Sequence, residues 1–195
     1  TDIVCTSTNA IKIVESIPED KQIIFAPDKN LGAYINRITG RNMILWDGAC
    51  MVHEAFSAKL IKELKSKNPN AVVIAHPESE ESVLAEAEYI GSTTGLLKYT
   101  INNPSNEFIV ATESGILHQM KKASPNKKFH VAPTTKNGHL CQACSDCPHM
   151  KLNTMQKLYD CLNNESPEIT LSDEIITKAR LSIDRMLEIS AKHGL

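Results

Sequence analysis

The fold is constrained most by a pattern that the chain repeats four times: a short apolar run, then a polar turn, then an amphipathic segment. The four polar turns are residues 6–9, 27–30, 76–79 and 112–115. Apolar runs of this length are typical of strands, and apolar residues at helical spacing are typical of covering helices. The repetition therefore predicts an α/β fold in which helices connect and cover the strands of parallel sheets.

The predicted strands are residues 2–6, 22–26, 42–46, 71–75, 108–111 and 129–132. The predicted helices are residues 9–16, 31–38, 51 to about 67, 82–90, 96–101, 116–123, 151–162 and 172–191. Phe56, Leu60, Ile61 and Leu64 are spaced to line one face of the long helix that begins at residue 51.

The polar turns matter because they lie where parallel strands end. Open α/β sheets bind ligands at that edge, since the helix N-termini there present free N–H groups to anions. Alternatively, each Ser, Thr, Asn or Asp only caps its helix, but four such turns in one chain favour a ligand-binding edge. The chain contains neither a GxGxxG nor a GxxxxGK[ST] motif, so the usual signals of a dinucleotide or P-loop phosphate site are missing.

Composition excludes several classes of protein. With 195 residues, a net charge of −2 and 42% hydrophobic residues, the chain lacks the basic character of a nucleic-acid-binding protein. No apolar run has the length of a membrane span, and no export signal is recognisable. We therefore expect a soluble protein whose cysteines sit in the reducing cytoplasm, with no membrane or nucleic-acid partner. Because the chain begins with Thr1, we also expect it to be a fragment.

Three of the six cysteines form a closely spaced run. Cys141, Cys144 and Cys147 are three residues apart, and Pro148 follows the last of them. Thiolates are soft ligands that suit zinc or iron–sulfur clusters, and a run that ends in Cys-Pro is closer to iron–sulfur usage. The alternative is a surface loop with a disulfide. We predict that at least one of these cysteines binds a metal or a cluster.

Two further pairs of residues are candidates for chemistry. His76 and Glu78 flank a proline at the end of a predicted buried strand, where they could exchange protons near neutral pH; the alternative is that Glu78 only stabilises the start of the next helix. Cys50 and His53 are three residues apart at the start of the long helix, which suits a metal ligand and a neighbouring imidazole. The alternative for Cys50 is an ordinary core cysteine.

Cys5 and Cys161 lie in runs predicted to be a strand and a helix. We interpret both of them as core residues.

Taken together, these motifs closely resemble those of the quinolinate synthase family. The matching segments occur in the family's order and run through nearly the whole chain. They are residues 6–10, 27–32, 46–50, 52–54, 76–78, 91–93, 111–113 and 141–153.

The resemblance implies an enzyme that condenses iminoaspartate with dihydroxyacetone phosphate to form quinolinate. It also implies a fold of repeated three-layer α/β/α Rossmann-like domains with parallel sheets. In that fold a [4Fe-4S] cluster takes one cysteine from each of three domains, and its open iron acts as a Lewis acid in dehydration. Functional coupling with L-aspartate oxidase or aspartate dehydrogenase is a further implication.

Mapped onto this chain, the resemblance divides it into three parts. Residues 1–80 correspond to the middle α/β/α domain and residues 81–150 to the last one, which carries the cysteine loop. Residues 151–195 correspond to C-terminal helices that pack back on the domains. The family's first domain, with its own cluster cysteine, has no counterpart in this chain. We therefore expect the chain alone to hold no stable cluster and to be inactive.

The resemblance also assigns roles to particular residues. The implied metal ligands are Cys50 and Cys147, and Cys141 and Cys144 are left as a disulfide or redox pair. The implied substrate-binding residues are Ser7, His76, Glu78 and Thr93, and the implied catalytic residues are His53, His76 and Glu78. The alternative reading is a non-catalytic zinc or redox module formed by Cys141, Cys144 and Cys147, with Cys50 or His149.

Overall fold

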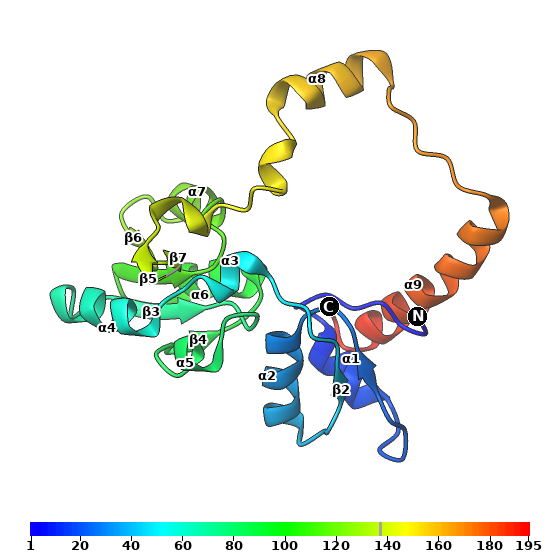
Figure 1. Ribbon diagram of the computed structural model, residues 1–195, viewed down its shortest axis with the longest axis horizontal. Coiled ribbons are helices and arrows are strands. Elements are labelled where there is room, and N and C mark those ends of the chain that lie inside the picture. Colours follow the sequence, from blue (N-terminus) through cyan, green and yellow to red (C-terminus); the bar gives the residue numbers. More distant parts are fainter. Residues whose placement is uncertain (137) are drawn as a thin grey trace.

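The computed structural model describes residues 1–136 and 138–195, and its strands form two parallel sheets and one small hairpin (Figure 1). The first sheet contains β1 (Ile24–Phe25) and β2 (Ile44–Leu45). Helices α1 (Ala10–Ser16) and α2 (Lys29–Thr39) share an apolar core with this sheet. We call residues 1–49 the first unit. Its succession of strands and helices confirms the predicted α/β class.

The second sheet has four parallel strands in the order β4, β3, β5 and β6. The strands are β3 (Val72–Ala75), β4 (Tyr89–Ile90), β5 (Glu107–Ala111) and β6 (Lys128–Val131). Residues 108–111 are fully buried, as expected for an inner strand of a parallel sheet that is covered on both faces. We call residues 50–152 the second unit.

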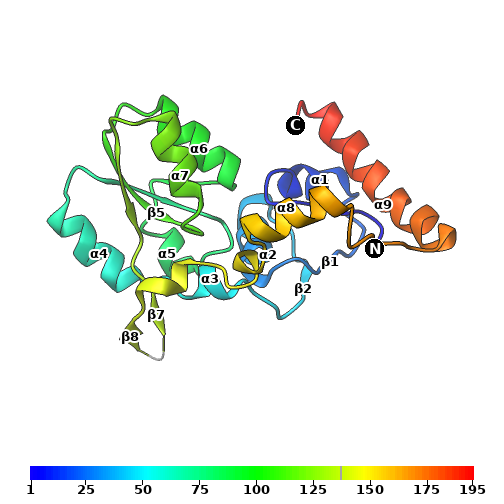
Figure 2. The same cartoon turned by 90° about the horizontal axis from the view of Figure 1, so that it is seen from above.

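Helices cover both faces of the second sheet (Figure 2). Val73 and Ile109 point into one apolar cluster, which includes residues of α4 (Ala58–Lys67) and α5 (Glu81–Leu84). Ile74 and Phe108 point into the opposite cluster, with α6 (Thr93–Asn102) and α7 (Ile116–Ala123). This alternation is the period of two along a strand. The result is a three-layer α/β/α arrangement, as predicted.

Three predictions about local structure are wrong. Residues 2–6 form no strand; there the Val4 N–H donates to the Ser182 carbonyl, 3.3 Å away. The segment predicted as one helix from residue 51 is split into α3 (Met51–Glu54) and α4. Residues 82–90 are not one helix, because α5 ends at Leu84 and residues 89–90 pair with β3 as β4. In each case tertiary contacts outweigh local propensity.

The break between α3 and α4 has a clear structural cause. Phe56 is buried and forms an isolated bridge with Thr134, and the backbone there pairs with the chain after β6. The Ser57 N–H donates to the Pro133 carbonyl over 3.1 Å, and the Thr135 N–H donates to the Ala55 carbonyl over 2.8 Å. Ser57 then caps α4 with its side chain. The break thus ties the end of α3 to the segment that leads into the cysteine loop.

Beyond the second sheet the chain forms a hairpin of β7 (Thr135–Lys136) and β8 (His139–Leu140), then the short 3-10 helices η1 (Gln142–Ser145) and η2 (Met150–Leu152). Helix α8 (Met155–Asn164) follows and lies away from both sheets (Figure 1). None of its residues is buried, so the prediction that Cys161 is a core residue is wrong.

Helix α9 (Asp173–Lys192) returns to the first unit and contacts α1. The Asn9 side-chain amide donates to Ser190 Oγ over 3.1 Å. The division of the chain at residue 80 stays a prediction, although β3, which precedes it, pairs with β4 and β5. Within the described residues, no helix has both the length and the apolar character needed to cross a membrane.

Candidate active site

The candidate site lies at the carboxyl end of β3. The His76 N–H donates to the Ala111 carbonyl over 3.0 Å, which extends the pairing with β5 by one residue. After Pro77 the chain turns, and the Glu78 N–H donates to Nδ1 of His76 over 3.3 Å. His76 is buried, with 4% of its surface exposed. The turn therefore orients the His76 ring and places Glu78 beside it, the two residues predicted to carry acid–base chemistry.

A residue of the first unit reaches this turn. Ser7 lies just before α1, and its Oγ is 3.2 Å from Nε2 of His76, although the two residues are 69 positions apart in the chain. The sequence singled out both residues. The structure brings them into contact, so the two units meet at the site.

Cys50, His53 and Glu78 form a compact cluster. One ligand atom from each residue lies within 4.8 Å of the other two, and Nδ1 of His53 is 3.2 Å from Oε2 of Glu78. The His53 ring stacks on the His76 ring, with 4.6 Å between the ring centroids. Residues from the start of α3 and from the end of β3 thus share one site.

Charge is distributed unevenly over this cluster. Burial lowers the pKa of His53, but Cys50 and Glu78 outweigh this effect and raise the pKa to about 9. Burial and the charge of His53 lower the pKa of His76 to about 4. Contact with His53 lowers the pKa of Cys50 against the effect of burial. At neutral pH the site therefore contains one imidazolium, one neutral imidazole and an ionised carboxylate, Glu78.

Two buried residues that sequence reasoning did not assign to the site fix its geometry. Thr112 follows β5 directly, is fully buried, and has its Oγ1 3.0 Å from Nε2 of His53. Asp28 accepts the N–H groups of Leu31 and Cys50, each over 2.8 Å. Asp28 thereby caps α2 and holds the Cys50 backbone. In the sequence both residues read as ordinary turn or cap residues.

Thr93 lies at the same edge of the sheet. The Gly91 N–H donates to the Ala75 carbonyl over 3.1 Å, which sets the start of α6 beside the end of β3. Ser92 caps α6 by accepting the Gly95 N–H. Thr93 is the first residue of α6, and it is exposed.

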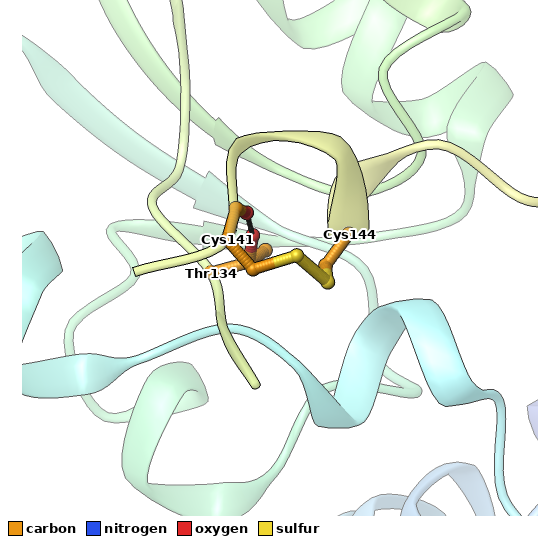
Figure 3. Close-up of a disulfide and its surroundings, with 3 residues drawn as sticks. All are labelled: Thr134, Cys141 and Cys144. Atoms are coloured by element: carbon orange, nitrogen blue, oxygen red, sulfur yellow. Dashed lines mark hydrogen bonds between the residues drawn. A yellow bond between two sulfur atoms is a disulfide. The ribbon is translucent and has the colours of Figure 1, made fainter. Parts of the chain in front are cut away.

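The cysteine loop contains a disulfide between Cys141 and Cys144 (Figure 3). Thr134 is hydrogen-bonded to Cys141 twice, once through its hydroxyl and once through its carbonyl, which accepts the Cys141 N–H over 2.9 Å. Cys147 is a free thiol, partly buried against the apolar cluster that Cys50 also contacts. Glu113 accepts the Cys147 N–H over 3.4 Å.

The thiol of Cys147 does not belong to the group of three close ligand atoms, which among the described residues is Cys50, His53 and Glu78. The disulfide leaves Cys50 and Cys147 as the free thiols next to that apolar cluster. Soft sulfur ligands of this kind fit an iron–sulfur cluster. Among the described residues, the Cys50, His53 and Glu78 side chains also place three donor atoms of types that bind metals close together.

Comparison with known proteins shows the family to which the chain belongs. A family model described as "Quinolinate synthetase A protein" matches residues 1–188. The chain belongs to the quinolinate synthase family. The family membership predicted from the motifs is therefore confirmed.

Individual relatives named quinolinate synthase support the assignment. The protein of Gloeothece citriformis is 57% identical over 189 residues, which cover 97% of this chain and 57% of the relative. The proteins of Microcystis aeruginosa and Chloroherpeton thalassium are 55% and 53% identical over 189 residues, and the match covers 97% of this chain and 58% of each relative. The chain thus spans 57–58% of the length of these quinolinate synthases.

Proposed function

We propose that this chain forms part of a quinolinate synthase, an enzyme of NAD biosynthesis that condenses iminoaspartate with dihydroxyacetone phosphate. The observation that carries the proposal is the contact of Ser7 with His76. It brings a hydroxyl of the first unit to the edge where the second unit presents His53, Glu78 and Cys50. An enzyme that joins two small molecules needs such a convergence of groups from separate elements.

The cofactor in this proposal is a [4Fe-4S] cluster, for which Cys50 and Cys147 would be the ligands from this chain. When bound, the cluster supplies a Lewis-acidic iron that polarises an oxygen of the substrate. The chain contributes two cysteines toward it, and the expectation that the chain alone is inactive is part of the proposal.

The residues of the chain have separate tasks. The Ser7 hydroxyl, Thr93 and the N-terminus of α6 bind substrate carboxylates, because hydroxyls and free N–H groups donate to anions. Glu78 is ionised and partly exposed, so its carboxylate accepts protons during condensation and dehydration. His76 is neutral and exchanges a proton at Nε2, beside Ser7. His53, as an imidazolium, stabilises negative charge on the intermediate.

Iminoaspartate is short-lived in water, so the proposal includes functional coupling with an enzyme that forms it, L-aspartate oxidase or aspartate dehydrogenase.

The phosphate and water that leave during condensation require proton donors. We assign this role to His76 and to the conjugate acid of Glu78.

A chimaera tests the proposal. In it this chain replaces the matching 57% of the Gloeothece citriformis relative. After anaerobic reconstitution with iron and sulfide, the chimaera should form quinolinate, measured by mass spectrometry. Glu78→Gln should abolish quinolinate while the visible absorption of the cluster stays unchanged. A Glu78→Gln chimaera with normal activity would refute the role of Glu78, and a reconstituted chimaera without activity would refute the proposed function.

One observation favours a second function, a non-catalytic redox or zinc module. The Cys141–Cys144 disulfide joins two cysteines of the run, and its reduction would release two thiolates beside Cys147 for zinc. Anaerobic absorption spectra separate the two functions, because iron–sulfur clusters absorb visible light and zinc thiolates do not.

A further inference from the structure

A cleft separate from the candidate active site lies where the two units meet, between α2 of the first unit and α5 of the second (Figure 1). Its volume is about 240 Å³, which is small for a ligand pocket. Its lining includes Asn30, Tyr34, Arg37, Ser79, Glu81 and Leu84. The Tyr34 ring packs against the apolar clusters of both units. The cleft therefore suits a molecule of few atoms that touches both units.

Two residues of the lining carry buried polar atoms that lack a hydrogen-bond partner within the described part of the chain. These atoms are Nδ2 of Asn30 and Oγ of Ser79, and Ser79 is fully buried. An unpaired buried polar group costs free energy, so its presence in a folded protein requires an explanation. Rotation about χ1 of Ser79 or χ2 of Asn30 can turn these atoms toward the cleft without a change in the backbone. Both groups can then donate hydrogen bonds to a ligand that offers acceptor atoms.

The lining of the cleft also contains one charge of each sign. Nη1 of Arg37 is 3.0 Å from Oε1 of Glu81, and the two side chains are 46% and 82% exposed. The Arg37 guanidinium lies 5.6 Å from the centroid of the Tyr34 ring, a cation–π contact that restricts its position. An ion pair this exposed contributes little to stability, so a ligand can insert between its partners. Because the pair has no net charge, the ligand that complements both partners is a zwitterion.

We propose that this cleft binds a small α-amino acid. The carboxylate of the ligand accepts hydrogen bonds from Arg37, Asn30 and Ser79. Its ammonium group pairs with Glu81, and the apolar surface of Leu84 suits a short apolar side chain. Because α2 and α5 belong to different units, the ligand links the two units and stabilises their contact. This site does not depend on the function proposed above.

Titration of the 195-residue chain with L-alanine, followed by two-dimensional amide NMR spectra, tests this site. We expect saturable shifts of the Ser79 backbone amide and of the Asn30 side-chain amide. Propionate lacks the ammonium group of L-alanine and ethylamine lacks its carboxylate, so each should bind roughly tenfold more weakly or worse. Arg37→Gln removes the charged donor to the carboxylate and should weaken L-alanine binding to a similar extent.

Two further variants separate a role in binding from a role in folding. Glu81→Gln removes the partner of the ammonium group and frees Arg37 for a carboxylate, so L-alanine and propionate should then bind equally well. Ser79→Ala should weaken L-alanine binding severalfold. It should not lower the melting temperature of the ligand-free chain, because the hydroxyl that it removes has no hydrogen-bond partner among the described residues.

Arg185→Gln and Glu63→Gln are the matched controls, because both residues are exposed and lie on α9 and α4, outside the lining of the cleft. Both variants should keep the affinity of the parent chain for L-alanine. The proposal is overturned if L-alanine causes no saturable shifts, if propionate binds the parent chain as tightly as L-alanine does, or if Arg37→Gln and Ser79→Ala bind like the controls. Failure of the chimaera to form quinolinate would leave these outcomes unaffected, so the two proposals fail independently.

Discussion

The two units of the molecule differ in the length of their strands and in how deeply the strands are buried. In the first unit the paired strands are only two residues long, and Ile24 and Ile44 are 74% and 55% exposed. In the second unit β5 is covered on both faces, and Ile109 is fully buried. The cluster of Cys50, His53 and Glu78 stands on this better-packed second unit. The first unit contributes Ser7, which contacts His76 beside the cluster, and Asp28, which accepts the Cys50 N–H.

The comparison indicates that the well-packed second unit holds most of the candidate catalytic residues, and that the less densely packed first unit adds hydrogen bonds to them. Groups placed at the ends of packed strands are held more precisely than groups on loops. Variants that affect one unit and not the other can test this division.

The largest difference should come from truncating apolar side chains in the two sheets. Ile109→Ala removes fully buried methyl groups and leaves a cavity, so it should lower the free energy of unfolding by about 2–5 kcal/mol. Ile24→Ala, in the exposed strand, should change it by less than about 1 kcal/mol. Urea denaturation measures both. Equal losses for the two variants would contradict the comparison.

Asp28→Asn should have the next largest effect. The carboxylate accepts two backbone N–H groups, and the amide can replace only one of these acceptors, so we expect a loss of about 1–3 kcal/mol. The matched control is Asp47→Asn, whose carboxylate is 96% exposed. Thermal unfolding compares the two, and an Asp28→Asn variant as stable as Asp47→Asn would show that the link to Cys50 is unimportant.

A smaller effect is expected for Ser7→Ala, which removes the hydroxyl beside Nε2 of His76. The expected loss is about 0.5–1.5 kcal/mol, the net contribution of one hydrogen bond. The His76 ring nitrogen resonances should also shift, because Nε2 loses its partner. Thr8→Ala, at an exposed neighbour, is the control. Unchanged His76 resonances in Ser7→Ala would argue against contact between the units in solution.

The smallest effect concerns the edge of the second sheet and depends on pH. Hydrogen bonds with Lys128, the larger contribution, and with His130 lower the pKa of Glu107 below its ordinary value of 4.5. The folded chain therefore keeps the carboxylate ionised where the unfolded chain would bind a proton. The resulting stabilisation is present above pH 4.5 and is lost as the pH falls through the folded-state pKa. Glu107→Gln should flatten this acidic decline in denaturation midpoints, and a slope identical to that of the parent chain would exclude the contribution.

Much of the second unit could be predicted from sequence, because its strands are continuous apolar runs between polar turns. Residues 71–75 and 108–111 overlap β3 and β5 closely. Residues 2–6 have a similar apolar character, yet they form no strand, because strand formation requires a neighbour that sequence does not reveal. Likewise Tyr89 and Ile90 become β4 only because β3 lies beside them.

For the site, sequence indicated the residue types but not their mutual positions. His76, Glu78, Cys50 and His53 stood out through their places at strand ends. The contact of Glu78 with His53 joins positions far apart in the chain, so no local pattern encodes it. Thr112 and Asp28 escaped notice because a buried Thr after a strand and an Asp before a helix are ordinary features of many turns.

The break between α3 and α4 makes Cys50 and the cysteine loop mechanically dependent on each other. Residues 55 and 57 form backbone hydrogen bonds with residues 135 and 133, which directly precede the segment that carries Cys141 and Cys147. In a continuous helix these backbone groups would form hydrogen bonds within the helix, and the cysteine loop would lack this connection to it. We therefore expect that these backbone hydrogen bonds would have to break before the cysteine loop could move independently of the helix that follows Cys50.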